Sequence, residues 1–154
     1  MVSVHAPVSI WKNRQTLSER TILQIENNAA NSDLVKQIIF RRGDLALLTA
    51  TSAIQGVEMA RTLQPDVILL DMKMPFMNGC DTLVLLLESV ETSHIPVVIL
   101  SSIGFPGESR HCLGAGAFAY LTKPYRIDDL MTSIDAALHA ETAGSCRSAH
   151  GQAS

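Results

Sequence analysis

Paired cysteines and long apolar runs are both missing from this sequence. Its three cysteines, Cys80, Cys112 and Cys146, are widely spaced, and no CxxC motif occurs among the 154 residues. A disulfide framework or a zinc site needs several ligands at short, regular spacings, so neither is expected and a reducing, cytoplasmic setting is favoured. The longest apolar runs, such as Val67–Leu70 and Leu83–Leu87, are far shorter than the roughly 18 residues that cross a membrane.

A strong charge of either sign is also missing. The 12 Lys and Arg residues nearly balance the 15 Asp and Glu residues, which leaves a net charge of −3. Proteins that bind nucleic acid neutralise phosphates with a basic surface, so nucleic-acid binding is not expected. Aromatic residues make up only 5% of the chain, but apolar residues make up 47%, which is enough for one domain with its own hydrophobic core. The N-terminus is interrupted by His5 and Pro7 and does not have the pattern of a secretion signal.

The middle of the chain alternates short apolar runs with amphipathic stretches. The apolar runs predict strands at residues 21–25, 45–51, 66–71, 95–100 and 117–121. The amphipathic stretches predict helices at 31–42, from Thr51 or Ser52 to Pro65, from Gly79 to about Val90, within 107–113 and at 126–140. Strands that alternate with helices in this way form a parallel sheet with helices on both faces.

A single domain accounts for all of these elements. We expect it to span residues 20–140, after a flexible leader at 1–19 that has no sustained periodicity. Residues 141–154 are small, polar and aperiodic, and we expect them to form a disordered tail. We expect no second domain with a catalytic or DNA-binding output, because too few residues are left to build one.

Polar side chains occur where four of the predicted strands end. They are Glu26 and Asn27 after the first strand, Asp71 at the end of the third, Ser101 after the fourth and Lys123 after the fifth. The carboxyl ends of parallel strands meet at one edge of a sheet, where ligands bind. These groups would therefore lie together, and such a set can hold a divalent cation and bind a phosphoryl group. Asp71 is the most informative, since a carboxylate that closes an apolar strand must be solvated, paired or bound to a metal.

The stretch DVILLDMKMPFMNG at residues 66–79 resembles the signature of the receiver domains of two-component response regulators. The distances along the chain from Asp71 to Glu26, Ser101 and Lys123 also match those of the family. The resemblance covers about residues 20–140 and is closest to receivers attached to hybrid sensor kinases. It implies a flavodoxin-like α/β fold with a five-stranded parallel sheet of order 2-1-3-4-5. Helices one and five would cover one face, and helices two, three and four the other.

The resemblance also implies the chemistry of the site. Asp71 would be the phosphoacceptor, whose carboxylate attacks a phosphohistidine of a sensor kinase or phosphotransfer protein. Mg²⁺ would be held by Glu26, Asn27, Asp71 and the backbone carbonyl of Lys73, and would offset the repulsion between anionic groups. Such a domain signals by phosphorylation and has no separate output enzyme.

Three further residues would bind the phosphoryl group or report its arrival. Ser101 would donate a hydrogen bond to a phosphoryl oxygen, and Lys123 would pair with the same group. As Ser101 moves inward, Tyr120 would rotate from an exposed to a buried position. The surface of the fourth helix, fifth strand and fifth helix would then report phosphorylation to a partner.

One position departs from the pattern of the family. Two adjacent acids usually follow the first strand, whereas this chain has Glu26 followed by Asn27. An amide oxygen can coordinate Mg²⁺ but adds no negative charge, so a weaker metal site is expected. The alternative interpretation is a receiver-like protein-interaction module that works without phosphorylation. A phosphatase of the haloacid dehalogenase type is disfavoured, because it needs an acid two positions after the Asp, where this chain has Lys73.

The predicted third helix is unusually apolar. At about 100° per residue, Leu83, Leu86 and Val90 share one face, which we expect to be buried. Val84 and Leu87 then point toward solvent. A cluster of exposed aliphatic side chains is typical of a protein contact, here a homodimer or a larger assembly. Scattered surface aliphatics, or a helix rotated to bury more of its surface, would explain the same pattern without a partner.

Overall fold

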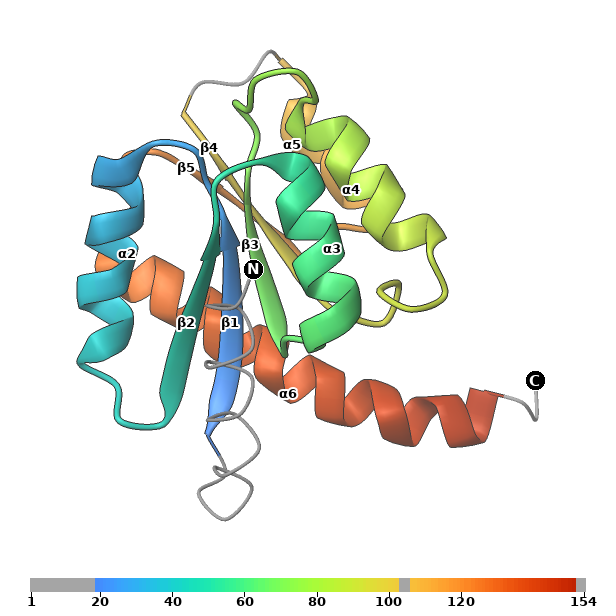
Figure 1. Cartoon of the computed structure of the whole chain (residues 1–154). Coiled ribbons are helices and arrows are strands. Elements are labelled where there is room, and N and C mark those ends of the chain that lie inside the picture. Colours follow the sequence, from blue (N-terminus) through green and yellow to red (C-terminus); the bar gives the residue numbers. More distant parts are fainter. Residues whose placement is uncertain (1–18, 103–105, 152–154) are drawn as a thin grey trace.

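Strands and helices alternate along the computed structural model, which describes residues 19–102 and 106–151 (Figure 1). The strands are β1 (Arg20–Ile25), β2 (Leu45–Ala50), β3 (Val67–Asp71), β4 (Val97–Ser101) and β5 (Ala119–Thr122). The helices are α2 (Ala29–Phe40), α3 (Ala53–Leu63), α4 (Gly79–Glu88), α5 (Glu108–Ala115) and α6 (Ile127–Gly151). Residues 1–18 of the predicted leader and 152–154 of the predicted tail lie outside the described residues.

The five described strands form one parallel sheet in the order β2-β1-β3-β4-β5, which confirms the predicted topology. β1 pairs with β3 through Ile25 and Leu70, and β3 pairs with β4 through Asp71 and Leu100. Because the strands are parallel and in this register, their carboxyl ends lie at the same edge of the sheet. The polar residues that follow the strands are therefore collected at one edge.

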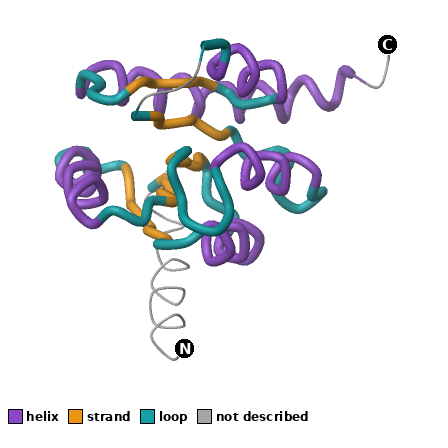
Figure 2. Tube along the Cα trace, turned by 90° about the horizontal axis from the view of Figure 1, so that it is seen from above, coloured by secondary structure: helices purple, strands orange, loops and turns teal. Residues whose placement is uncertain are grey.

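Helices cover both faces of the sheet, as Figure 2 shows from above. On one face, alternate strand residues such as Leu23, Ile68 and Ile99 pack with residues of α3, α4 and α5. On the other face, the residues between them, such as Ile22 and Leu69, pack with α2 and α6. Every residue of β3 is buried, as expected for a strand that is covered on both sides. The predicted division of the helices between the two faces is confirmed.

Side-chain caps explain where three of the helices begin. Asn28, Ser52 and Asn78 each accept a hydrogen bond from the backbone N–H three residues later, at the starts of α2, α3 and α4. A cap of this kind is worth about 1 kcal/mol, because it satisfies a backbone donor that the helix leaves unpaired. Ser52 rather than Thr51 is the cap of α3. Asn28 and Asn78 also fix the chain next to the strand ends that carry Glu26 and Asp71.

The apolar helix α4 ends earlier than predicted. Its last residue is Glu88, so Val90 lies beyond the helix and is 87% exposed, and the prediction that Val90 is buried is wrong. Leu87 was expected to face solvent but is half-buried, because Gly116 has no Cβ and leaves room for its side chain. A Cβ built on Gly116 would come within 2.9 Å of Leu87 Cδ1. Val84 is 42% exposed, as predicted, and its exposed neighbour is Leu85 at 43%.

The last helix is longer than predicted. Residues 141–154 were expected to be a disordered tail, whereas α6 continues to Gly151. The additional turns include alanines and a glutamate, which favour helix, and extending a formed helix avoids the cost of nucleating a new one. None of the described helices is long and apolar enough to cross a lipid bilayer.

Candidate functional site

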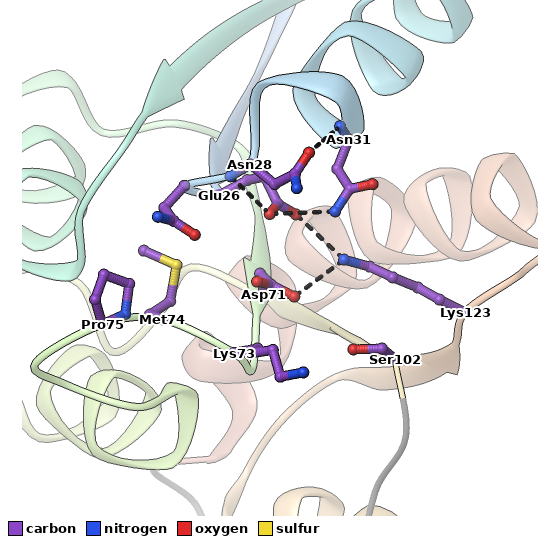
Figure 3. A pocket seen from close by; sticks show the side chains of 10 residues that line it. Glu26, Asn28, Asn31, Asp71, Lys73, Met74, Pro75, Ser102 and Lys123 are labelled. Atoms are coloured by element: carbon purple, nitrogen blue, oxygen red, sulfur yellow. Dashed lines mark hydrogen bonds and ion pairs between the residues drawn. The ribbon is translucent and has the colours of Figure 1, made fainter.

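The ends of β1, β3 and β5 bring three charged side chains into contact (Figure 3). Lys123 Nζ lies 3.0 Å from Asp71 Oδ1 and 3.3 Å from Glu26 Oε1. The three residues are far apart in the chain. Side chains alternate between the two faces along a strand, and these three follow the alternate residues that pack against α2 and α6. These residues were predicted to lie together at the carboxyl ends of the strands, and the structure places their side chains in contact.

Burial shapes the electrostatics of this trio. Asp71 is only 4% exposed, and this burial raises the pKa of its carboxyl group. The hydrogen bond from Lys123 opposes the rise, whereas the charge of Glu26 adds to it. Burial alone would lower the pKa of Lys123, but the hydrogen bond and charge of Asp71, together with Glu26, outweigh it and raise that pKa. Lys123 is therefore a firmly held cation between two buried acids.

Glu26 is held in place by the start of α2. Its Oε2 accepts hydrogen bonds from the backbone N–H of Asn28 at 3.1 Å and from Asn31 Nδ2 at 3.4 Å. Its Oε1 accepts from Lys123, so both oxygens of this 1% exposed carboxylate have partners. The capping residue of α2 thus also positions one acid of the site.

An open pocket of about 420 Å³ lies beside the trio. Asn27 and Lys73 are exposed and line this pocket. Ser102 lines the pocket, and its side chain is drawn in Figure 3. The full set of lining residues is Glu26, Asn27, Asn28, Asn31, Asp71, Lys73, Met74, Pro75, Ser102 and Lys123.

Ser101 is not among the residues that line this pocket. It is 2% exposed, and its Oγ lies 3.3 Å from Oε1 of Glu108, the first residue of α5. The Tyr120 hydroxyl donates to the same Glu108 oxygen at 2.6 Å. Ser101 and Tyr120 lie in phase with the strand residues that face α3, α4 and α5.

Sequence reasoning missed Glu108. An acid in the first turn of a helix is usually there because it interacts favourably with the helix dipole, so the sequence offers no signal that singles this one out. Only the packing of α5 against β4 and β5 buries the carboxylate between two hydroxyl groups. Ser102, which lines the pocket, was not predicted to have a role either.

The loop between β3 and α4 approaches the site closely. Gly79 is the first residue of α4, at the end of this loop. A Cβ built on it would lie 2.6 Å from Met72 Cα and 2.5 Å from the Met72 sulfur, so only glycine fits at this position without a shift of the backbone. Phe76 has a φ of +69° and a fully exposed side chain. Positive φ is strained for a bulky residue, and such strained residues cluster at functional sites.

The oxygen atoms at the pocket suit a hard divalent cation. Glu26 and Asp71 supply carboxylates, Asn27 an amide and Lys73 a backbone carbonyl. The described residues contain no cluster of three or more His, Cys, Asp or Glu that could hold a metal by themselves. Amide and backbone oxygens would have to complete the ligand set, which suits Mg²⁺ rather than zinc. Lys123 compensates only one of the two acids, so an added cation is electrostatically favourable.

A second hollow of about 400 Å³ adjoins the first and shares Asn31, Ser102 and Lys123 with it. Its remaining lining is more apolar and comes from Leu34 of α2 and from Pro124 and Tyr125 after β5. The charged site therefore opens next to a surface that a protein partner can cover.

Several known proteins with similar sequences or structures are described as response regulators or receiver domains. The pattern that defines the response regulator receiver domain matches residues 22–135. The polar-differentiation response regulator DivK of Brucella ovis is 26% identical over 115 residues, which is 75% of this chain and 93% of DivK. A CheY-like receiver domain protein from Methanospirillum hungatei JF-1 has a TM-score of 0.76 at 25% identity, with 82% of this chain and 99% of that one covered.

A third similar protein is described with a bound metal. The receiver domain of sensor histidine kinase PA1611 from Pseudomonas aeruginosa PAO1 has a magnesium ion coordinated in its active site cleft. Its TM-score is 0.71 at 23% identity, and the match covers 79% of this chain and 98% of that one. The match over residues 22–135 covers most of the chain and agrees with the sheet order and the strand-end residues. The chain belongs to the response regulator receiver domain family of two-component systems.

Proposed function

We propose that Asp71 accepts a phosphoryl group from a phosphohistidine of a sensor kinase or phosphotransfer protein in the cytoplasm. The observation that carries this proposal is the placement of Asp71, a buried carboxylate at a strand end, 3.0 Å from Lys123 and beside an open pocket. An oxygen of Asp71 forms a bond to phosphorus as the N–P bond breaks. The electron pair of the N–P bond stays on the imidazole, which takes up a proton from solvent.

Lys123 supports this reaction electrostatically. Its ammonium group touches the acceptor carboxylate and would pair with an oxygen of the transferred group. Glu26, Asn27, Asp71 and the carbonyl of Lys73 would hold Mg²⁺. When bound, Mg²⁺ would reduce the repulsion between the carboxylates and the incoming phosphoryl group. Glu26 is fixed by Asn28 and Asn31 and so needs little rearrangement to serve as a ligand.

The neighbouring hollow supports a protein as the phosphoryl donor. Leu34, Pro124 and Tyr125 offer an apolar surface next to Lys123, which a partner can cover while its histidine reaches Asp71. A small phosphate ester would not use this surface. The phosphorylated domain would pass its signal to another protein by a change of conformation.

Phosphorylation with acetyl phosphate and Mg²⁺ tests the proposal. Intact mass measurement should show one phosphoryl adduct in the wild-type protein and none in Asp71→Asn. Asp81→Asn is the matched control, because Asp81 is an exposed carboxylate in the first turn of α4. Loss of the adduct in Asp81→Asn but not in Asp71→Asn would contradict the assignment.

A phosphorylation-independent interaction module is the second candidate function. Asn27 favours it, because an amide at this edge of the pocket gives a weaker cation site than the second acid of the family's pattern. Absence of an adduct at millimolar Mg²⁺, in protein that binds its partner equally well with and without acetyl phosphate, would support this second function.

A further inference from the structure

Glu108 is a buried acid whose hydrogen-bond donors are hydroxyl groups, whereas Glu26 and Asp71 accept from the ammonium group of Lys123. It begins α5, is 7% exposed, and accepts hydrogen bonds from two hydroxyl groups, those of Ser101 and Tyr120. Burying a carboxylate is costly unless hydrogen bonds and nearby dipoles stabilise it. Within the described residues, the two hydroxyls and the N-terminus of α5 supply that stabilisation.

The contact with Ser101 engages the hydroxyl group that we predict to donate to a phosphoryl oxygen on Asp71. A serine hydroxyl has one proton to donate. At 3.3 Å from Glu108 Oε1, the Ser101 hydroxyl donates to this carboxylate, since an ionised carboxylate can only accept. It cannot donate to a phosphoryl oxygen on Asp71 at the same time. The two acceptors therefore compete for one proton.

We propose that Glu108 is a positioning residue that holds Ser101 and Tyr120 in the arrangement of the unphosphorylated protein, so that a phosphoryl group on Asp71 must compete with Glu108 for the Ser101 hydroxyl. This inference rests on the proposed function. Glu108 opposes phosphorylation and at the same time links the site to Tyr120, because both hydroxyls meet at its Oε1.

Of the two hydroxyl groups that donate to Glu108, that of Tyr120 lies closer. The 2.6 Å bond makes Tyr120 the stronger of the two partners, and burial together with this bond raises the pKa of the tyrosine hydroxyl. Release of Ser101 would leave Tyr120 as the partner that still satisfies the carboxylate.

A titration with acetyl phosphate at fixed Mg²⁺ measures the competition. Glu108→Ala removes the competing acceptor, and the acetyl phosphate concentration for half-maximal phosphorylation should fall about fivefold, the effect of one net hydrogen bond. Glu108→Gln keeps an uncharged acceptor of similar shape and should give a smaller fall. Asp129→Ala, which removes an exposed acid from the first turn of α6, should leave the titration unchanged.

A second background separates positioning from a general effect on folding. In Ser101→Ala there is no hydroxyl to compete for, so adding Glu108→Ala should change the half-maximal concentration by less than about twofold. Circular dichroism melts of every variant verify that each is folded. Fluorine NMR of 3-fluorotyrosine protein reports the Tyr120 contact without any phosphorylation, and Tyr125→Phe identifies the signal, since the chain has two tyrosines.

Each outcome bears on a different statement. A fivefold fall that disappears in the Ser101→Ala background, with a lower phenol pKa for Tyr120 in Glu108→Ala, supports the inference. A half-maximal concentration that is the same with and without Glu108, or a fall that persists without Ser101, overturns the inference and leaves the proposed function intact. Absence of an adduct in the wild-type protein overturns both.

Discussion

Replacement of Lys123 by methionine tests the electrostatic reasoning about the site most directly. The substitution keeps an unbranched side chain of similar length but removes the cation that lies 3.0 Å from Asp71 and 3.3 Å from Glu26. At an effective dielectric constant of about 20, each contact is worth roughly 5 kcal/mol before desolvation is counted. Taking the ammonium group and the carboxylates out of water costs several kcal/mol per ion and cancels much of this gain.

The net effect follows from what the substitution leaves behind. Removing one partner of a buried ion pair costs about 3–5 kcal/mol, because the other charge stays buried without compensation. The Lys123 side chain is 17% exposed and the pocket admits water, so we expect a loss just below this range, about 2–3 kcal/mol at pH 7. Lys36→Met on the exposed surface of α2 is the control and should change stability by less than about 0.5 kcal/mol.

The loss should depend on pH in a defined direction. Without Lys123 the pKa of Asp71 rises further, since the hydrogen bond that opposed the effect of burial is gone. A carboxyl group whose folded pKa exceeds its unfolded pKa destabilises the fold as pH rises through that interval. The variant should therefore differ little from the wild type near the ordinary pKa of an aspartate and fall behind as the pH approaches neutrality.

Urea denaturation followed by circular dichroism, from pH 4 to pH 8, measures both effects. The reasoning is refuted if Lys123→Met is as stable as the wild type at pH 7. It is also refuted if the loss of stability is the same at every pH, since a loss of packing alone would not titrate.

Three further predictions concern the acceptor, the loop beside it and the surface of α4. Asp71→Asn should stabilise the folded protein at neutral pH, because burial and the charge of Glu26 raise the pKa of the Asp71 carboxyl group and so make its ionised form costly. A urea midpoint lower than that of the wild type would contradict this. Gly79→Ala should lower the free energy of unfolding by about 2–3 kcal/mol, because the new Cβ would collide with Met72. Gly43→Ala, whose Cβ would have no atom within 4 Å, should change it by less than about 0.5 kcal/mol, and equal melting temperatures of the two variants would contradict this. Val84→Lys should reduce self-association in sedimentation equilibrium without lowering the melting temperature, and an unchanged average mass would argue against a contact through α4.

Of the two residues predicted to form a contact surface on α4, only one is well exposed. Val84 is exposed and stays a candidate for a protein contact, but Leu87 packs beside Gly116 and contributes mainly to the core. Leu85, which is 43% exposed, is the aliphatic neighbour of Val84 on this surface. The buried face of a helix depends on which elements it packs against, and a repeat of 3.6 residues does not define that face within one position.

The sequence by itself determined the order of the elements and the topology of the sheet. Apolar runs of strand length, amphipathic stretches and capping residues such as Ser52 are local signals, because backbone geometry and hydrogen bonding act over a few residues. The meeting of Glu26, Asp71 and Lys123 was also predictable, since parallel strands collect their carboxyl ends at one edge.

Only the tertiary structure decided which way the remaining side chains face and what they touch. Ser101 ends a strand like Asp71, but its hydroxyl donates to the buried Glu108, and it is not among the residues that line the pocket. Glu108 is buried only because α5 packs against the ends of β4 and β5, and no local pattern marks it. These contacts join residues from different elements, so their energies depend on packing that exists only once the chain has folded.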